Sequence, residues 1–261
     1  MPIDMTTFRL TTFLTGIIGL LTAETVWPAR AWKTLRSKRI IFHACLSTFN
    51  TLVLRVPAYI PLVALLNYMN THQIGLSHIL KLSPAVNIIA TVILFDMFDY
   101  WWHRFNHRIP ILWQFHKVHH VDTHVDTTTS LRFHPGELAF SFLFKAVWIV
   151  LWSPTLWAYV IFEASVTLAA QFHHTNIDFP DPIENGLRKV FVTPRYHTAH
   201  HTVNQRTGNN NFATIFIFWD KLFTTYRIPD FEEMKYLGLP KGRNIYLKIT
   251  QTLTAPFRNI Y

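Results

Sequence analysis

Apolar residues occur in long stretches along this chain, separated by shorter segments rich in charge, proline and histidine. The first stretch covers about residues 8–27, close to the ~20 residues that an α-helix needs to cross a bilayer. A second, residues 41–68, contains two prolines, so it either crosses once with a kink or forms a re-entrant hairpin. A third, residues 84–102, begins with a proline that suits the first turn of a helix. The pattern predicts successive membrane-spanning helices.

The longest apolar stretch, residues 138–172, is interrupted at Ser153 and Pro154. At about 1.5 Å per residue, each half is roughly 25 Å long, which is enough for one tilted membrane helix. We therefore expect a transmembrane hairpin whose two ends lie on the same side of the membrane. Residues from 175 onward are more polar and are expected to form a cytosolic helical cap. Altogether the chain is predicted to be an all-α integral membrane protein with about four or five transmembrane helices.

Positive charge after the first span predicts the orientation of the chain. Within ten positions the sequence contains Arg30, Lys33, Arg36, Lys38 and Arg39. Loops rich in lysine and arginine face the cytoplasm, so the N-terminus is expected on the opposite side. Counting spans from this loop brings every histidine-rich segment to the cytoplasmic face. A bacterial inner membrane and the endoplasmic reticulum fit this topology equally.

Composition supports a membrane protein and excludes several other classes. Apolar residues make up 50% of the 261 positions and charged residues 15%, against about a quarter in soluble domains. The net charge of +9 is spread along loops without a basic-aromatic module, so nucleic-acid binding is not expected. A single cysteine excludes an intramolecular disulfide and any multi-cysteine zinc or iron–sulfur site.

Three groups of histidines occur at helical spacing near these apolar stretches. They are His103-x-x-x-His107, His116-x-x-His119-His120 and His197-x-x-His200-His201. Positions i, i+3 and i+4 share a helix face, so each group is expected to present its imidazoles in one direction. One tetrahedral zinc ion uses at most about four ligands, so these histidines, with His173 or His174 as a further ligand, predict two metal ions. Iron, copper, zinc and nickel all suit nitrogen ligands, so affinity does not choose among them.

The reaction therefore has to distinguish the metals. A redox-inert zinc pair would indicate a membrane hydrolase or isomerase, which usually also needs a carboxylate to position water. An iron pair could use O2 to oxidise an unactivated C–H bond, and the apolar surroundings favour this second hypothesis. A third hypothesis is a non-catalytic protein that binds or transports metal. Transport needs polar ligands along a span, whereas these clusters gather at one end.

An ordered set of motifs resembles the fatty acid hydroxylase/sterol desaturase superfamily over about residues 96–226. The motifs are His103-Arg104-x-x-His107, His116-x-x-His119-His120, Arg132-x-His134-Pro135-x-Glu137, His174-x-Asn176, His197-x-x-His200-His201, Asn211-Phe212 and Trp219-Asp220-Lys221-Leu222-Phe223. The resemblance implies a membrane-bound di-iron oxidoreductase that hydroxylates or desaturates a lipid, such as a sterol or fatty acyl chain. It implies two Fe ions as cofactors, with zinc as the other occupant of purified protein, and O2 as co-substrate.

The resemblance also implies the ligands and the partners. The metal ligands would be His103, His107, His116, His119, His120, His197, His200 and His201, with His174 added and His173 competing for its place. Neither a haem-binding module nor a Gly-rich dinucleotide fingerprint occurs in the sequence. Electrons are therefore expected from a separate reductase, cytochrome or ferredoxin.

Four further residues are predicted to support the ligands. Asp99 lies four positions before His103 on the same helix face, where a carboxylate could accept the imidazole N–H. His134 is a candidate ligand, outer donor or helix cap, and Glu137 either complements a helix N-terminus or orients a ligand. Asn176 follows the His174 motif and is placed with this supporting set.

Two ionisable residues lie inside the predicted hairpin, and charge at that depth is a functional candidate. Lys145 and Glu163 are at similar distances from the turn on opposite arms, so they are expected to form an ion pair. Contact with a substrate headgroup is the other interpretation. We divide the chain into an N-terminal transmembrane region (1–95), a catalytic domain (96–226) and a C-terminal cytosolic tail (227–261).

Overall fold

The computed structural model describes residues 4–32, 35–228, 230–240 and 248–258, and α-helices dominate them. In these ranges no β-strand forms, and only two isolated bridges pair backbone segments. Four helical segments are long and apolar enough to cross a membrane: Met5–Val26, Arg36–Ile79, Pro84–Arg108 and Pro135–Trp152. The prediction of an all-α membrane protein is confirmed. Lys33 of the basic loop and residues 241–247 of the predicted tail lie outside the described residues.

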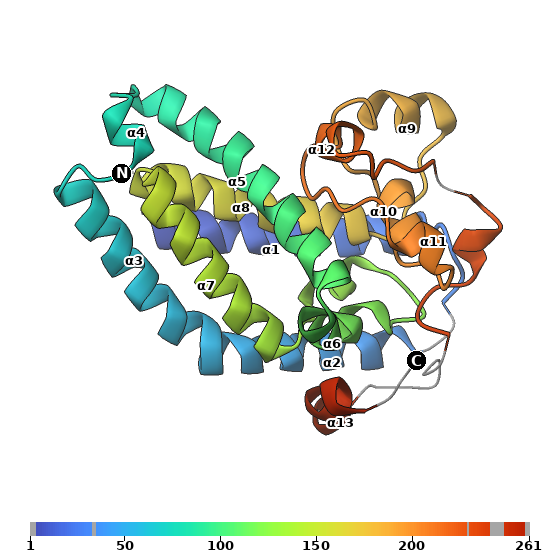
Figure 1. Ribbon diagram of the computed structural model, residues 1–261. Helices are drawn as coiled ribbons and strands as arrows, with labels where there is room; N and C mark the ends of the chain where they lie inside the picture. The colour runs from blue at the N-terminus through green and yellow to red at the C-terminus, as the bar shows by residue number, and fades with distance from the viewer. Residues whose placement is uncertain (1–3, 33–34, 229, 241–247, 259–261) are drawn as a thin grey trace.

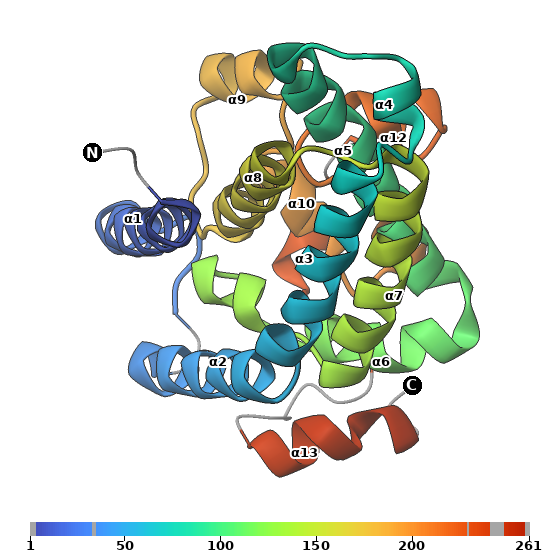
Figure 2. The same ribbon diagram turned by 90° about the vertical axis from the view of Figure 1, so that its left-hand side faces the viewer.

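The long helices form a bundle, and short helices form a cap at one end (Figure 1). The bundle contains α1 (Met5–Val26), α2 (Arg36–Asn50), α3 (Val56–Thr71), α5 (Pro84–Arg108), α7 (Pro135–Trp152) and α8 (Leu156–His174). The cap contains α9 (Asp181–Leu187), α10 (Pro194–His200), α11 (Gln205–Gly208) and α12 (Phe218–Leu222). Two short helices, α4 (Leu76–Ile79) and α13 (Ile249–Thr254), lie at the periphery (Figure 2).

The second apolar stretch forms a kinked helix and not a re-entrant hairpin. Its two parts, α2 and α3, are joined without reversal by a π-helical segment at Thr51–Arg55. Pro57 lies in the first turn of α3, where a proline costs no backbone hydrogen bond, and Pro61 follows one turn later. A π-helical segment changes the helix direction. As a result α2 lies along one side of the bundle while α3 turns away towards α4 (Figure 1).

The predicted hairpin is present, as α7 and α8 joined at Ser153, whose φ of 54° ends α7 in a left-handed turn. The second arm, α8, is not among the four membrane-spanning candidates. It bears Glu163 and two terminal histidines, and it is packed against both α1 and α5. A close crossing with α1 occurs at Gly16, where a Cβ would approach a methyl of Leu168 to 2.9 Å.

The core between the bundle helices is aromatic and aliphatic. Its buried members come from α3, α5, α7 and α8: Leu62, Leu66, Phe95, Phe98, Ile149, Trp152, Tyr159 and Phe162. A second cluster joins the end of α5 to the cap through Tyr100, Val192, Tyr196, Phe212, Ala213, Ile217 and Trp219. These clusters fix the ends of α5 and α8 relative to the cap, and the histidines lie at those ends.

The predicted ion pair within the hairpin is confirmed. Lys145 Nζ donates to Glu163 Oε1 at 2.6 Å, and both side chains are 18% exposed. Replacing Glu163 with Gln leaves the ammonium without its counter-charge. We expect Glu163→Gln to lower the unfolding midpoint in detergent, by less than the about 3–5 kcal/mol typical of fully buried pairs. The double variant Lys145→Met/Glu163→Gln should recover most of the loss. An unchanged midpoint together with altered substrate preference would instead favour the headgroup interpretation.

Candidate dimetal centre

Four helices bring the histidines together at the junction of bundle and cap. They are α5, α6 (Pro110–His120), α8 and α10. Two adjacent groups have ligand nitrogens that all lie within 4.8 Å of one another. The first group consists of His103, His107, His116, His120 and His200. The second group consists of His119, His174, His197 and His201.

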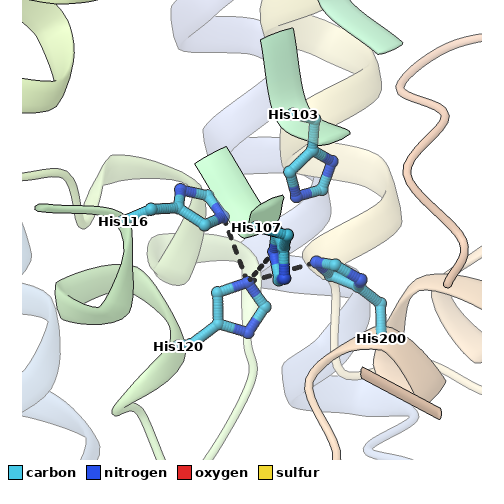
Figure 3. A group of neighbouring side chains, drawn as sticks. All are labelled: His103, His107, His116, His120 and His200. Carbon is cyan, nitrogen blue, oxygen red and sulfur yellow. Dashed lines mark hydrogen bonds between the residues drawn. The ribbon is translucent and has the colours of Figure 1, made fainter. Parts of the chain in front are cut away.

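In the first group, the close contacts to three other histidines converge on one nitrogen of His120 (Figure 3). Its Nε2 atom lies 3.1 Å from the Nε2 atoms of His107, His116 and His200. A neutral imidazole carries one N–H, so His120 could donate to one of these three nitrogens at most. Hydrogen bonding within the group therefore cannot account for the convergence of the nitrogens.

Hydrogen bonds at Nδ1 fix the tautomers of three of these histidines. His103 Nδ1 lies 2.8 Å from the Phe212 carbonyl, and His200 Nδ1 lies 2.7 Å from the Asn210 carbonyl. His116 Nδ1 lies 2.8 Å from a carboxylate oxygen of Glu137. A carbonyl or carboxylate oxygen only accepts, so each Nδ1 must carry the proton. Each Nε2 then carries no proton, and its lone pair is directed into the group.

In the second group, two of the four histidines have the same arrangement. His174 Nδ1 donates to the Ala170 carbonyl at 2.7 Å and His119 Nδ1 to the Arg132 carbonyl at 3.2 Å. The two bare Nε2 atoms nevertheless lie 3.1 Å apart. His197 Nε2 lies 3.1 Å from His174 Nε2 and 3.2 Å from His201 Nε2. Two lone pairs at this distance repel each other unless a cation lies between them.

The spacing fits a metal ion in each group. Metal–imidazole bonds of about 2.1 Å place neighbouring ligand nitrogens about 3.0 Å apart at right angles and about 3.4 Å apart at the tetrahedral angle. The observed Nε2 separations of 3.1–3.2 Å fall in that interval. The two groups are also in contact, because the rings of His120 and His201 stack with centroids 4.5 Å apart. The residues present therefore fit a pair of neighbouring metal ions.

Burial favours the neutral form of His119, His120, His197 and His200. Desolvation lowers the pKa of His200 to about 3, and it lowers the pKa values of His119, His120 and His197 well below the usual range. Protonated neighbours would add repulsion in the same direction. A metal ligand must be the neutral imidazole, so the metal-free site is already in the ligand-competent protonation state.

Our expectation that each histidine motif points in one direction is wrong. His116 and His120 belong to the first group, whereas His119 belongs to the second. The third motif is divided in the same way, since His197 and His201 join the second group and His200 the first. Residues i and i+4 differ by about 40° around a helix, whereas i+3 and i+4 differ by about 100°. The second and third motifs therefore each contribute two histidines to one group and one to the other, whereas His103 and His107 of the first motif both belong to the first group.

The structure also distinguishes the two histidines at the end of α8. His174 belongs to the second group, and His173 belongs to neither. The His173 Nδ1 atom lies 3.1 Å from the Thr214 carbonyl, and the His173 ring packs against that of His197 with centroids 4.0 Å apart and the ring planes tilted by 42°.

His134 and Glu137 both lie at the start of α7. His134 is the N-cap, accepting from the Gly136 amide at 2.9 Å, and it is absent from both groups. Its capping role is confirmed. Glu137 lies in the first turn and also binds His116, so both roles considered for it are realised.

Two supporting residues do not act as predicted. The His103 imidazole donates to Phe212 and not to Asp99. Asp99 instead interacts electrostatically with Lys145 and Glu163. Within the described residues Asn176 makes no hydrogen bond to a histidine, and its side chain pairs with both backbone groups of Arg30. Both predictions used proximity along the chain, and the actual partners come from distant segments.

Sequence reasoning missed the acceptors that orient the first group. They come from one segment after α11: Asn209 Oδ1 at 3.3 Å from His107 Nδ1, and the carbonyls of Asn210 and Phe212. Carbonyl acceptors leave no trace in a residue pattern. The single available signal was the Asn-rich run itself, together with the adjacent closing motif.

Comparison with known proteins places this site in a family. The fatty acid hydroxylase family model matches residues 88–225. An alkylglycerol monooxygenase of Danio rerio is 32% identical over 141 residues, covering 54% of this chain and 30% of the relative. An ornithine lipid hydroxylase of Rhizobium tropici is 26% identical over 145 residues, covering 56% and 43%. A cholesterol 25-hydroxylase of Rattus norvegicus is 26% identical over 142 residues, covering 54% and 47%.

These matches cover less than half the length of each relative, and no solved structure matches the chain. The family model covers more than half of this chain and contains all nine histidines of the two groups. The predicted resemblance is therefore confirmed: the chain belongs to the fatty acid hydroxylase family.

Proposed function

We propose that this protein is a membrane-bound, O2-dependent di-iron oxidoreductase that hydroxylates or desaturates a lipid, using electrons from an external donor. The observation that carries the proposal is the pair of adjacent histidine groups, five and four imidazoles, with their bare nitrogens directed inwards. The first ion would be held by His103, His107, His116, His120 and His200, and the second by His119, His174, His197 and His201.

The ligand chemistry supports iron over zinc. Every candidate ligand in the two groups is an imidazole, and no carboxylate belongs to either of them among the described residues. A hydrolytic zinc pair usually needs a carboxylate that positions water. When bound, an iron pair would supply activation of O2 for attack on an unactivated C–H bond. The nitrogen-only donor set is compatible with Fe as well as with Zn, Cu and Ni.

The overall reaction requires reducing equivalents. Hydroxylation converts R–H, O2, two electrons and two protons into R–OH and water, and desaturation converts the same co-reactants and a –CH2–CH2– unit into an alkene and two waters. The protein's own contribution is to bring the nine imidazoles together and to orient several of them through Nδ1 acceptors such as Glu137, Asn209 and Phe212. A separate reductase, cytochrome or ferredoxin would supply the electrons.

A membrane lipid is the proposed substrate class. The relatives are named as enzymes that act on alkylglycerols, an ornithine lipid and cholesterol, which are all lipids with a polar headgroup. In this chain the centre lies where the apolar bundle meets the polar cap (Figure 1). A lipid with its tail along the bundle would bring carbons near its headgroup closest to the histidines.

We also propose that the centre faces the cytoplasm. The end of α1 and the start of α2, between which the basic loop lies in the sequence, are at the cap end of the bundle, and α1 begins at the opposite end (Figure 1). A multi-pass arrangement follows if all four apolar segments cross the membrane. The division into residues 1–95, 96–226 and 227–261 belongs to the same proposal.

Metal analysis and product analysis test this function together. Protein purified without oxygen should contain two irons per chain. With a chemical or enzymatic reductant and a panel of glycerol ether lipids, ornithine lipids and sterols, it should transfer one atom of 18O2 into the product, or form an alkene. Comparing the membrane lipids of cells with wild-type protein and with His119→Ala should show which lipid is oxidised.

Two results would overturn the proposal. Tightly held zinc with O2-independent turnover would establish a hydrolase or isomerase. Metal uptake into vesicles with no lipid oxidation would establish transport.

A further inference from the structure

A buried glutamate of the N-terminal region contacts two histidine-bearing segments. Glu24, near the end of α1, is fully buried. Its Oε2 atom accepts from the amide of Thr127 at 3.0 Å, from the Thr127 hydroxyl at 2.8 Å, and from the amide of Asn176 at 2.9 Å. Its other oxygen pairs with Arg36 of α2 at 2.9 Å. One carboxylate thus ties the start of the 127–131 turn to the end of α8, two residues after His174.

Arg39 of α2 makes a second set of contacts. This residue belongs to the basic segment that the sequence places in a cytoplasmic loop, but it is buried in α2 and only 4% exposed. Its guanidinium binds Asp122 through two nitrogens at 2.7 and 2.8 Å, and Asp126 at 2.8 Å. The arginine charge keeps the pKa of Asp122 far below its usual range. The sequence showed the charge of Arg39, but its two acidic partners lie more than 80 positions away.

These contacts continue to a ligand of the second group. Asp122 and Asp126 both accept from residues of the 3-10 turn at Thr127–Leu131. This turn ends at Arg132, whose amide donates to the Thr129 carbonyl at 3.0 Å. The Arg132 carbonyl then accepts from His119 Nδ1. Arg39 therefore fixes the turn that presents the acceptor orienting His119.

The loop between α1 and α2 contacts the remaining segments. Arg30 pairs through its backbone with the Asn176 side chain, and its guanidinium donates to the Val125 carbonyl at 2.9 Å. The same guanidinium lies 3.4 Å from the hydroxyl of Thr198, which directly follows His197. Three ligands of the second group, on three different segments, are thus reached from residues 24–39.

The first group is oriented by a different part of the chain. Its Nδ1 acceptors are supplied by Glu137 and by the 209–212 segment. Within the described residues, none of its ring nitrogens has a hydrogen-bond partner before residue 84. Asp122 follows His120 closely in sequence, but the His120 imidazole is directed into the first group.

We propose that Glu24, Arg30 and Arg39 form an N-terminal clamp whose role is to position the second histidine group, so that the histidines of the two groups are oriented by separate parts of the protein. The clamp lies outside residues 88–225, the part that matches the family model. A buried ion pair stabilises a fold little more than apolar residues would, so a network this extensive is better explained by the geometry it specifies. The inference rests on the proposed dimetal function.

Zinc release from the full-length protein in detergent tests the clamp without using catalysis. Wild-type protein loaded with Zn²⁺ should release two equivalents to a chelator. Arg39→Gln should lower the affinity for one of the two zinc equivalents about ten- to hundredfold, the effect expected when the groups that orient a ligand are lost. Glu24→Gln should weaken the same equivalent through Asn176 and His174. Lys38→Gln is the matched control, because it removes an exposed charge from the neighbouring position of α2.

Further variants identify which equivalent is affected. Glu137→Gln, which acts on His116, should weaken the other equivalent. In a His174→Ala background, Arg39→Gln should cause no further loss, because the two substitutions act on the same ion. Arg39→Lys keeps a cation between Asp122 and Asp126 and should retain much of the second equivalent. If Arg39→Gln does not fold, Glu24→Gln and Arg39→Lys provide the same comparison.

The outcomes separate the two proposals. Equal weakening of both equivalents by Arg39→Gln or Glu24→Gln would show a general structural role and overturn the clamp, while leaving the dimetal function intact. If neither variant changes the release of zinc, the clamp is overturned as well. Wild-type protein that takes up no metal would overturn the dimetal function itself, and the clamp with it.

Discussion

Replacing His120 with alanine should abolish lipid oxidation and remove one of the two metal ions. The Nε2 atom of His120 is the one that lies 3.1 Å from three other ligand nitrogens, so its loss opens the centre of the first group. Losing an outer partner of a ligand already costs about 10- to 100-fold, so losing the ligand itself should cost at least about a hundredfold in turnover. Iron content should fall from two to about one per chain. Both quantities can be measured on the same anaerobic preparation.

A histidine beside the centre but outside both groups provides the control. His134→Asn keeps a side chain able to cap α7, since Asn is among the preferred N-cap residues. Iron content and turnover should therefore remain close to those of the wild type. If His120→Ala keeps two irons and full turnover, the assignment of the first group is wrong.

The ligands were predictable because their signal is local. Three motifs at helical spacing, such as His116-x-x-His119-His120, can be recognised without knowing the fold. The apolar stretches gave the helices for the same reason, and α5 extends only six residues past its predicted end at Trp102. Pro84 and Ser153 mark the start of α5 and the end of α7, where the sequence indicates a break.

The sorting of histidines into two groups was not predictable from the motifs. It depends on contacts such as the one between His120 and His200, which are 80 positions apart. Helical spacing shows that i and i+3 lie on neighbouring faces, but the position of the second metal decides whether they bind one ion or two. Only the three-dimensional arrangement of α6, α8 and α10, which brings His120 to His200 and His119 to His174, supplies that information.

The carboxylates that support the histidines were even harder to predict from the sequence. Asp96 and Asp99 both share a face with His103, and the nearer one was chosen because it lies one helical turn away. In the structure Asp96, the farther of the two from His103, has the larger role in holding the segment that orients the first group. Proximity along a helix predicts which residues share a face, but not which of them meets an unpaired donor on another segment.

Asp96 holds the segment that orients the first group. It is completely buried on α5. Its Oδ1 accepts from the Ile215 amide at 2.9 Å, and its Oδ2 accepts from the Phe216 amide at 3.0 Å and from Trp219 Nε1 at 2.9 Å. These donors lie just after Phe212, the residue whose carbonyl accepts a hydrogen bond from His103. A buried carboxylate is costly, but three donors directed at it offset that cost.

A second carboxylate, that of Asp220 in the cap, binds the same segment. Asp220 accepts from the amides of Phe212 at 2.8 Å and Ala213 at 2.9 Å. Its Oδ1 also accepts from the Thr225 hydroxyl at 2.7 Å. The two aspartates together leave the 212–216 backbone few unpaired amides. Removing either one should therefore affect both the fold and the orientation of His103.

Asp96→Leu is expected to be the most destabilising single substitution that leaves every metal ligand in place. It would orphan three buried donors, at about 1–3 kcal/mol each, so the free energy of unfolding should fall by about 3 kcal/mol or more. For a chain of this size this corresponds to a decrease of about 6–12 °C in the unfolding midpoint, measured in one detergent for all variants. Asp96→Asn keeps the acceptor for Ile215 but presents an amide NH2 to the Phe216 and Trp219 donors, so its loss should be intermediate. Because the 212–216 segment carries the acceptor for His103, metal in the first group should be released sooner as well. A Leu variant as stable as the wild type, with unchanged metal release, would show that this segment is held by its apolar contacts and that the carboxylate is dispensable.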